Sequence, residues 1–289
     1  HPKKALMMIL AAVLGSILGV CVVIVLEWLD RTFRTAEQIE TALDTTVVGQ
    51  IPLLDIGVHV VDYILEKPNS VYAEAHRSVR TALHFTNPDQ PPQVVLVTSA
   101  VANEGKSSFS TALGCLLAKA GQKVLVLDCD LRKPSVANIL GLKYKDGLGD
   151  VLVHDRPLKN TFVDHQESQV DILPALPNTP NSNELLASQK MKKVLTELRK
   201  SYDLILLDTP PISAVEDALT LTELADAAVF VTKWGFTPKD LVAQSMRALR
   251  KTRIRLAGSV LTQVDVQKMK QYSTAYYESY TYAEKYYEN

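Results

Sequence analysis

The spacing of apolar residues changes along this chain of 289 residues, and each change predicts a different element. From Ala5 to Leu26 no charged side chain interrupts the sequence. About 20 apolar residues are enough to cross a bilayer, so we expect a transmembrane helix over residues 5–26. A cleaved signal peptide is the alternative, but the run is long for its apolar region and lacks a small-residue cleavage site. Basic residues flank both ends, so the positive-inside rule does not decide the orientation.

Beyond this span, short apolar runs alternate with longer amphipathic segments. Strands buried on both faces are typically unbroken apolar runs, so the alternation predicts a mostly parallel sheet with helices on both faces. A linker is expected over residues 51–69. The expected strands cover residues 94–98, 123–128, 170–173, 204–208, 227–232 and 257–262. The expected helices cover residues 35–43, 70–85, 109–117, 183–200 and 239–252, with another after residue 213.

A phosphate-binding loop is the clearest chemical signal. Residues 100–108, AVANEGKSS, stand between an expected strand and an expected helix, which is the context of a P-loop. In such a loop backbone N–H groups surround the phosphates, Lys106 reaches the terminal oxygens and the Ser107 hydroxyl binds Mg²⁺. Ala100 replaces the usual first glycine, which makes the match less specific. We expect a nucleoside triphosphate site; an ordinary glycine–lysine turn before a helix is the alternative.

Two further expected strands end in carboxylates. One run reaches Asp128 and continues to Asp130, and another ends at Asp208 before Thr-Pro-Pro. The carboxyl ends of parallel strands form the ligand-binding edge of a sheet, and Asp208 has the place of a Walker B aspartate, which holds the Mg²⁺ shell. Each aspartate alone could cap a helix or a turn. Three strand ends that carry a P-loop and these acids favour one shared site.

The motifs together resemble the bacterial tyrosine kinases (BY-kinases) of the polysaccharide co-polymerase family, which use a P-loop fold rather than the eukaryotic kinase fold. The resemblance covers nearly the whole chain. It rests on the P-loop, Asp128-x-Asp130-x-Arg132, Leu-Leu-Asp208-Thr-Pro-Pro, Arg34-Thr35-Ala-Glu37, Gly49-Gln-Ile-Pro52, Glu74-x-x-Arg77-x-x-Arg80, Gly147-Leu-Gly-Asp150-Val-Leu, Pro180-Asn-Ser-Asn-Glu184-Leu-Leu and a tyrosine-rich end.

The resemblance implies an α/β, P-loop NTPase-like fold with one preceding transmembrane helix and a flexible tyrosine-rich tail. It implies an ATP- and Mg²⁺-dependent protein-tyrosine autokinase that phosphorylates its own tail in trans and regulates the synthesis, polymerisation or export of capsular polysaccharide or exopolysaccharide. The implied partners are further copies in a ring, the membrane, the polysaccharide assembly and export machinery and a protein tyrosine phosphatase. Two other classes stay open: a non-kinase P-loop ATPase switch that controls membrane assembly, and a structural chain-length regulator with a vestigial site.

The resemblance also implies residue roles. Asp128 is the candidate to orient or deprotonate the incoming hydroxyl, although either Asp128 or Asp130 could belong to the outer shell of the metal. Related ATPases often place an adenine-contacting asparagine where this chain has Thr262, so adenine recognition there is open. Catalytic roles are expected for Lys106, Asp128, Asp130 and Asp208; nucleotide contacts for Ala102, Asn103, Glu104, Gly105, Lys106, Ser107, Ser108 and Arg132; metal contacts for Ser107, Asp128 and Asp208.

Seven of the 11 tyrosines crowd the last segment, mixed with Ser, Thr, Glu and Lys. They follow neither the helical nor the strand period, which favours a flexible tail. A low-complexity terminus without function is the alternative, but beside a nucleotide site the resemblance implies autophosphorylation. The expected acceptors are Tyr272, Tyr276, Tyr277, Tyr280, Tyr282, Tyr286 and Tyr287.

The expected helix over residues 70–85 carries three charged residues spaced by three: Glu74, Arg77 and Arg80. At this spacing they could pair within the helix for a few tenths of a kcal/mol each. The resemblance instead implies ion pairs to a neighbouring subunit. The expected apolar face of this helix consists of Val71, Ala75, Val79, Ala82 and Leu83.

Composition excludes several classes. The 31 basic and 32 acidic residues nearly cancel, so no nucleic-acid partner is expected. The three cysteines lack metal or disulfide spacing, which fits a reducing compartment. Because ATP is cytosolic, the expected location is the bacterial inner (cytoplasmic) membrane with the kinase domain in the cytoplasm. The expected divisions are an extracytoplasmic remnant over 1–4, the span over 5–26, a juxtamembrane segment and linker over 27–69, the kinase domain over 70–265 and the tail over 266–289.

Overall fold

The computed structural model describes residues 3–288 and divides into two compact units, His1–Thr32 and Phe33–Asn289. The first unit consists of helix α1 (Lys4–Leu29). Its segment Met7–Val25 has a mean hydropathy of 2.9 and is long and apolar enough to cross a membrane. The expectation of a membrane-length apolar helix here is therefore confirmed in length and composition.

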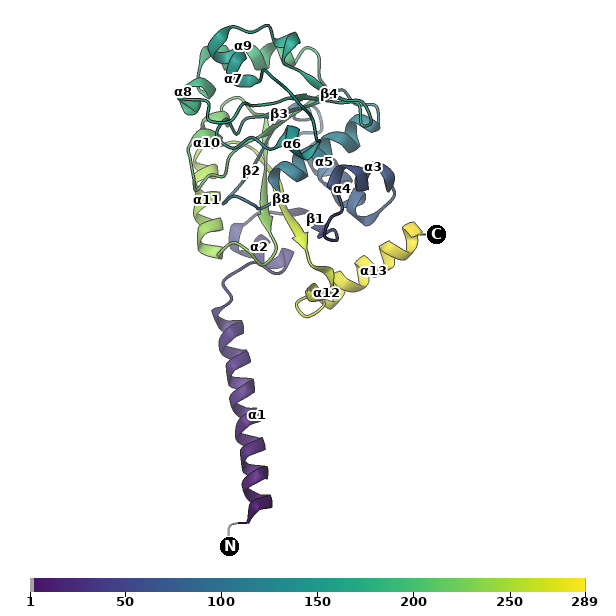
Figure 1. Cartoon of the computed structure of the whole chain (residues 1–289), viewed down its shortest axis with the longest axis vertical. Helices are drawn as coiled ribbons and strands as arrows, with labels where there is room; N and C mark the ends of the chain where they lie inside the picture. The colour runs from purple at the N-terminus through teal and green to yellow at the C-terminus, as the bar shows by residue number, and fades with distance from the viewer. Residues whose placement is uncertain (1–2, 289) are drawn as a thin grey trace. The chain divides into compact units, whose positions relative to one another are not determined.

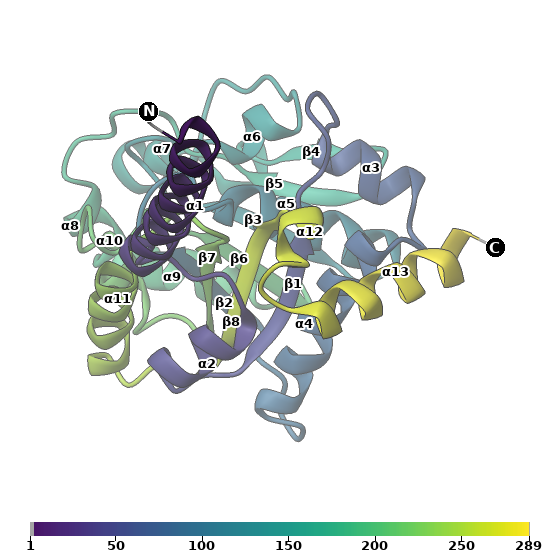
Figure 2. The same cartoon turned by 90° about the horizontal axis from the view of Figure 1, so that it is seen from below.

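The second unit is built on an eight-stranded sheet with the order β1-β8-β7-β2-β6-β3-β5-β4 among the described residues (Figures 1 and 2). Every neighbouring pair is parallel except β4 with β5, which is antiparallel. The mostly parallel sheet predicted from the sequence is confirmed. The strands are β1 (Val47–Pro52), β2 (Val94–Ser99), β3 (Val124–Asp128), β4 (Val163–His165), β5 (Val170–Leu173), β6 (Leu204–Asp208), β7 (Ala227–Lys233) and β8 (Leu256–Val264).

Helices cover both faces of this sheet because alternate strand residues point to opposite sides. In β2, Val94 and Leu96 join one hydrophobic cluster, whereas Val95 and Val97 join the other. The first cluster includes residues of α2, α9 and α11, and the second includes residues of α3, α4 and α5. The helices are α2 (Ala36–Leu43), α3 (Val60–Glu66), α4 (Val71–Thr86), α5 (Lys106–Lys119), α6 (Val136–Ile139), α7 (Leu148–His154), α8 (Ser182–Leu186), α9 (Gln189–Leu198), α10 (Asp217–Leu221), α11 (Lys239–Lys251), α12 (Val266–Met269) and α13 (Thr274–Glu288), with a 3₁₀ turn at Leu158–Asn160.

Three expected elements differ from the structure. The linker over residues 51–69 is wrong, because β1 extends to Pro52 and α3 lies within it. The helix expected over 183–200 is two helices, since the Ser188 hydroxyl caps a new helix by accepting from the Met191 N–H at 3.2 Å. In α4 the buried face is Tyr72, Ala73, His76, Val79 and Leu83, so only two members of the expected apolar face are fully buried.

The C-terminal segment also departs from the sequence prediction. It folds into α12 and α13 rather than an irregular tail, so that part of the prediction is wrong. Met269 is 1% exposed, and both Tyr272 and Tyr276 pack against the hydrophobic core. The Ser273 hydroxyl accepts from the Tyr276 N–H at 3.3 Å at the start of α13. Mixed side chains hid the helical period because the partly buried positions of α13 are mostly tyrosines rather than large aliphatic residues.

Candidate functional site

The ends of three adjacent strands form the site. In the sheet β6 lies between β2 and β3, and Asp208 is the register partner of both Val97 and Asp128. The backbone N–H of Cys129 donates to the Asp208 carbonyl at 2.8 Å, which holds the two aspartate-bearing strand ends together. The P-loop, Asp128 and Asp208 therefore meet at one edge of the sheet, as their positions in the sequence predict.

The P-loop has the backbone turn that phosphate binding needs. Asn103 and Gly105 have positive φ angles of 65° and 83°, and α5 begins directly after at Lys106. A Cβ atom on Gly105 would lie 3.2 Å from the Gln263 amide, so glycine also permits a close approach there. The first N–H groups of a helix lack acceptors within it, and the helix dipole favours an anion at that end. The start of α5 is thus suited to a phosphate.

Glu104 braces this loop from inside the protein. Its side chain is fully buried, and the carboxylate accepts from the Val101 N–H at 2.8 Å, the Thr237 hydroxyl at 2.7 Å and the Lys233 N–H at 3.3 Å. Burial raises the pKa of Glu104, which the hydrogen bond from Thr237 opposes. The expected nucleotide contact of Glu104 is therefore confined to its backbone, because the carboxylate joins the loop to the segment after β7. Ala102 and Asn103, by contrast, are exposed.

Asp208 is a buried carboxylate with one unused oxygen. Its Oδ1 accepts from the Ser110 hydroxyl at 3.3 Å, whereas Oδ2 is buried and has no hydrogen-bond partner. Burial raises the pKa of Asp208, and the nearby charge of Lys106 lowers it. An orphaned oxygen beside a serine hydroxyl suits Mg²⁺, a hard cation that takes oxygen ligands and keeps several waters. Within residues 3–288 no three His, Cys, Asp or Glu side chains form a direct metal cluster.

Asp128 is held rigidly by backbone donors. Its Oδ2 accepts from the N–H groups of Ser135 and Val136 at 2.9 and 3.1 Å, and Oδ1 accepts from Asp130 at 3.1 Å. Burial, and then the nearby charge of Asp208, raise the pKa of Asp128 to about 8 despite these bonds. A carboxyl group with this pKa is suited to exchange a proton near neutral pH.

Arg132 is oriented by residues that the sequence analysis missed. Asp217, which is 1% exposed, accepts from Arg132 Nε at 3.4 Å and from the Ser182 hydroxyl at 2.8 Å. The Asp130 carboxylate accepts instead from the backbone N–H groups of Arg132 and Lys133, at 3.3 and 2.9 Å. Asp217 lies at the start of α10, six residues after the DTPP motif, and an aspartate there reads as an ordinary helix cap.

An apolar pocket of ≈ 150 Å³ adjoins the P-loop. Thr262 lines this pocket, but its hydroxyl donates to the Glu104 carbonyl at 2.6 Å. The pocket lies between the β1–α3 connection and the first turn of α5. Its lining is Ile51, Pro52, Leu53, Leu54, Val58, Val60, Tyr72, Gly105, Ser108, Phe109, Thr262 and Gln263.

Known proteins share this arrangement. Residues 62–250 match the family described as AAA domain. The tyrosine-protein kinase YwqD of Bacillus subtilis (strain 168) is 35% identical over 208 residues, which cover 72% of this chain and 88% of YwqD. The chain belongs to the bacterial tyrosine kinases. The resemblance stated from the motifs is confirmed, and with it protein-tyrosine kinase activity.

Two further relatives of this BY-kinase differ in how much of their own length matches this chain. The succinoglycan biosynthesis transport protein ExoP of Rhizobium meliloti (strain 1021) is 28% identical over 303 residues, which cover 94% of this chain but 38% of ExoP. The solved kinase domain of Escherichia coli tyrosine kinase ETK superposes with a TM-score of 0.73 and 26% identity, covering 80% of this chain and 94% of that one. The P-loop fold is thereby confirmed.

The helix expected at a subunit interface forms an internal ion pair in this BY-kinase. On α4, Arg77 pairs with Glu74 at 3.1 Å and also donates to the Pro68 carbonyl. Arg80 is exposed and has no hydrogen-bond or ion-pair partner within residues 3–288. The pairing within the helix is thus present in a single chain, and the contact with a neighbour stays a prediction.

The buried Asp128 predicts a pH-dependent stability. Because its pKa is about 8 when folded and near 3.8 when unfolded, only the folded state keeps the proton between these values. Stability should therefore fall as pH rises through this window. We expect the melting temperature of the wild type, relative to Asp128→Asn, to fall by ~10 °C between pH 5 and pH 8, since roughly 3 pH units at ~1.4 kcal/mol each shift it by ~2–4 °C per kcal/mol. Calorimetry of both proteins in detergent tests this, and parallel curves would contradict it.

The brace at Glu104 predicts a local effect on the P-loop. Glu104→Ala leaves the Val101 N–H and the Thr237 hydroxyl without their acceptor, which costs about 1–3 kcal/mol for each buried group. We expect amide exchange of the loop to accelerate by roughly tenfold or more. Exchange followed by mass spectrometry measures this, with Glu223→Ala at an exposed position as the control. Unchanged exchange of the loop in Glu104→Ala would refute the brace.

Proposed function

We propose that this BY-kinase transfers the γ-phosphoryl group of Mg-ATP to the tyrosine hydroxyls of its own C-terminal segment, with the acceptor supplied by a neighbouring copy. The observation that carries the proposal is the meeting of the P-loop, Asp128 and the orphaned Asp208 oxygen at one sheet edge. Phosphoryl transfer depends mainly on positioning and charge stabilisation, and this edge supplies both.

In the transfer, the phenolic oxygen forms a bond to the γ-phosphorus as the bond to the β,γ-bridging oxygen breaks and ADP leaves. The phenolic proton passes to the ionised form of Asp128, whose fraction increases as the pH rises toward its pKa of about 8. Lys106 and the N–H groups at the start of α5 stabilise charge on the phosphate oxygens. Ser107 and Asp208 hold Mg²⁺, which supplies further charge stabilisation when bound. Arg132, oriented by Asp217, faces the remaining anionic oxygens.

The apolar pocket beside the P-loop is proposed to take the nucleotide base. Its position next to Gly105 and Ser108 puts it within reach of a nucleotide whose phosphates lie in the loop. Leu53, Leu54 and Val58 offer apolar contacts, and the Gln263 amide carries both a donor and an acceptor for the edge of the base. Gln263 would thus take the role of the adenine-contacting asparagine of related ATPases, which Thr262 cannot fill because its hydroxyl is bonded to the Glu104 carbonyl.

The cellular setting follows from α1 and from the relatives. A cytosolic nucleotide supports a cytoplasmic location of the second unit, and the length and composition of α1 support its insertion in the bacterial inner membrane. ExoP is named for succinoglycan biosynthesis and transport, which supports a role in polysaccharide synthesis, polymerisation or export. Copies of this chain would form a ring through Glu74, Arg77 and Arg80, work beside the polysaccharide export machinery and be reset by a protein tyrosine phosphatase.

The decisive experiment is phosphotyrosine mapping after incubation of the full chain with labelled ATP and Mg²⁺. Lys106→Met should lower incorporation by at least about 100-fold, because it removes a charge contact to the transferring phosphate. Lys119→Met, at the other end of α5, is the matched control and should keep wild-type incorporation. Both proteins are made in a host without other tyrosine kinases. Mg²⁺-dependent ATP hydrolysis without phosphotyrosine would indicate an ATPase switch instead.

The ring proposal predicts an effect of α4 on assembly. Replacing Glu74, Arg77 and Arg80 by alanine should convert oligomers to monomers and make the remaining autophosphorylation concentration-dependent. The control replaces Lys193 and Glu197 on α9 and Lys200 just after it, which carry the same charges and an equivalent ion pair of 2.7 Å between Glu197 and Lys200. Light scattering in detergent gives the mass. An unchanged mass in the α4 variant would leave only the internal ion pair, worth a few tenths of a kcal/mol.

A further inference from the structure

The C-terminal segment is attached to the kinase unit by an aromatic stack around Arg34. The Arg34 guanidinium lies 4.4 Å from the centre of the Trp234 ring and 5.5 Å from that of Tyr272. The Trp234 and Tyr272 rings meet edge to face at 6.1 Å. The quadrupole of an aromatic ring attracts a cation held over its face. Tyr272 therefore contributes to stability in this position through its ring.

The position of Arg34 in this stack is fixed by hydrogen bonds to the backbone around it. The Trp234 Nε1–H donates to the Arg34 carbonyl at 2.8 Å, and the Gly235 N–H donates to the Phe33 carbonyl at 2.9 Å. Gly235 has a φ of +58°, and a Cβ there would lie 2.0 Å from the Arg34 guanidinium. The residues before α2, the segment after β7 and the C-terminal segment thus meet at one point.

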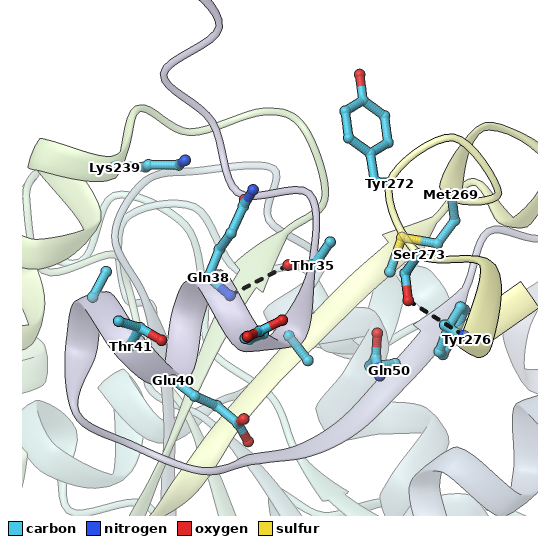
Figure 3. A pocket seen from close by; sticks show the side chains of 13 residues that line it. Thr35, Gln38, Glu40, Thr41, Gln50, Lys239, Met269, Tyr272, Ser273 and Tyr276 are labelled. Carbon is cyan, nitrogen blue, oxygen red and sulfur yellow. Dashed lines mark hydrogen bonds between the residues drawn. The ribbon is translucent and has the colours of Figure 1, made fainter.

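Tyr276 is a second point of attachment. It packs against the same hydrophobic cluster as Tyr272, and burial together with the neighbouring Tyr280 raises the pKa of Tyr276. Figure 3 shows Tyr272, Ser273 and Tyr276 along one wall of a cavity of ≈ 760 Å³ whose other wall is α2. Because this cavity separates α13 from α2, attachment on this side depends on the two tyrosines and on Met269.

The outer face of α13 carries tyrosines of a different kind. Tyr282 is 75% exposed and Tyr286 is 69% exposed. They are four residues apart and so neighbours on the helix surface, and Glu278 lies four residues before Tyr282. Their hydroxyls reach solvent without any change in the helix.

We propose that the C-terminal tyrosines form two classes: Tyr282 and Tyr286 are the first phosphate acceptors, and Tyr272 and Tyr276 are anchors that become acceptors only after the segment is released. This rests on the proposed autophosphorylation and adds its order. An anchor must leave its stack before its hydroxyl enters any active site, whereas an outer tyrosine is already accessible.

Phosphorylation of the outer pair promotes that release. Each phosphate adds about 1.5–2 negative charges at neutral pH. Two phosphates four residues apart, with Glu278 beside the first, place three like-charged groups on one face of α13. Like charges at this spacing destabilise a helix. The first round of transfer therefore loosens α13 and exposes Tyr276 for a second round.

The test is a time course of phosphate incorporation in the full chain with Mg-ATP, resolved by tyrosine. We expect Tyr282 and Tyr286 to be labelled at least about tenfold faster than Tyr272 and Tyr276. Tyr282→Phe with Tyr286→Phe should delay labelling of Tyr276, and Tyr277→Phe with Tyr280→Phe is the control that removes as many acceptors. Equal rates at all seven tyrosines, or labelling of Tyr276 first, would overturn the two classes. Absence of phosphotyrosine everywhere would instead reject the proposed kinase reaction.

A second variant releases the anchors directly. Arg34→Ala removes the cation between the two rings and should raise the labelling rate of Tyr276 to that of Tyr282. Arg31→Ala, which removes the same charge outside the stack, should not. Emission from Trp234, observed in a Trp28→Phe background, should shift on undocking in Arg34→Ala and during the second round in the wild type. An unchanged order of labelling in an Arg34→Ala protein whose emission has shifted would refute the anchoring role.

Discussion

Two carboxylates at the ends of neighbouring parallel strands, buried without direct ion pairs, are the constraint around which the site is organised. Parallel pairing of β3 with β6 makes Asp128 and Asp208 register partners, so their proximity follows from the sheet itself. Burial penalises both charges, and backbone N–H groups offset the penalty at Asp128. Asp208 keeps an oxygen without a partner. A bound Mg-nucleotide, through its cation, would relieve the cost of burying these charges. The arrangement therefore favours binding of Mg-nucleotide.

A second constraint concerns the shape of the P-loop. The Glu104 side chain joins the P-loop to Lys233 and Thr237 by hydrogen bonds. Between these two positions lies Trp234, whose ring contacts the Arg34 guanidinium. The loop that binds phosphate and the segment that leaves α1 are thus two contacts of one short connection after β7. A displacement of either segment would be transmitted to the other through a few hydrogen bonds rather than through the whole sheet.

Much of the architecture could be predicted because it depends on local sequence periods. Unbroken apolar runs gave β2, β3, β6 and β7, and the glycine–lysine turn gave the start of α5. The contacts that were missed join distant positions: Asp217, which was not predicted, orients Arg132 across 85 positions, and the Glu104 carboxylate reaches Thr237 across 133. The prediction of an irregular C-terminal tail was wrong for a different reason. Tyrosine is amphipathic, so a row of tyrosines gives no contrast between an apolar and a polar face. The helical period of α13 therefore cannot be recognised from the hydropathy of its residues.

The position of β1 also changes where the catalytic unit begins. Residues 33–69 supply α2, the edge strand β1 and α3, and Phe33 and Ile39 are fully buried in the main hydrophobic cluster. A protein shortened to the expected kinase boundary at residue 70 would lose the strand that pairs with β8. It would expose a new sheet edge and the apolar face beneath α2, both of which favour aggregation. The natural place to separate this unit from α1 is between Thr32 and Phe33, and most of the segment expected to be a juxtamembrane linker is part of the folded unit.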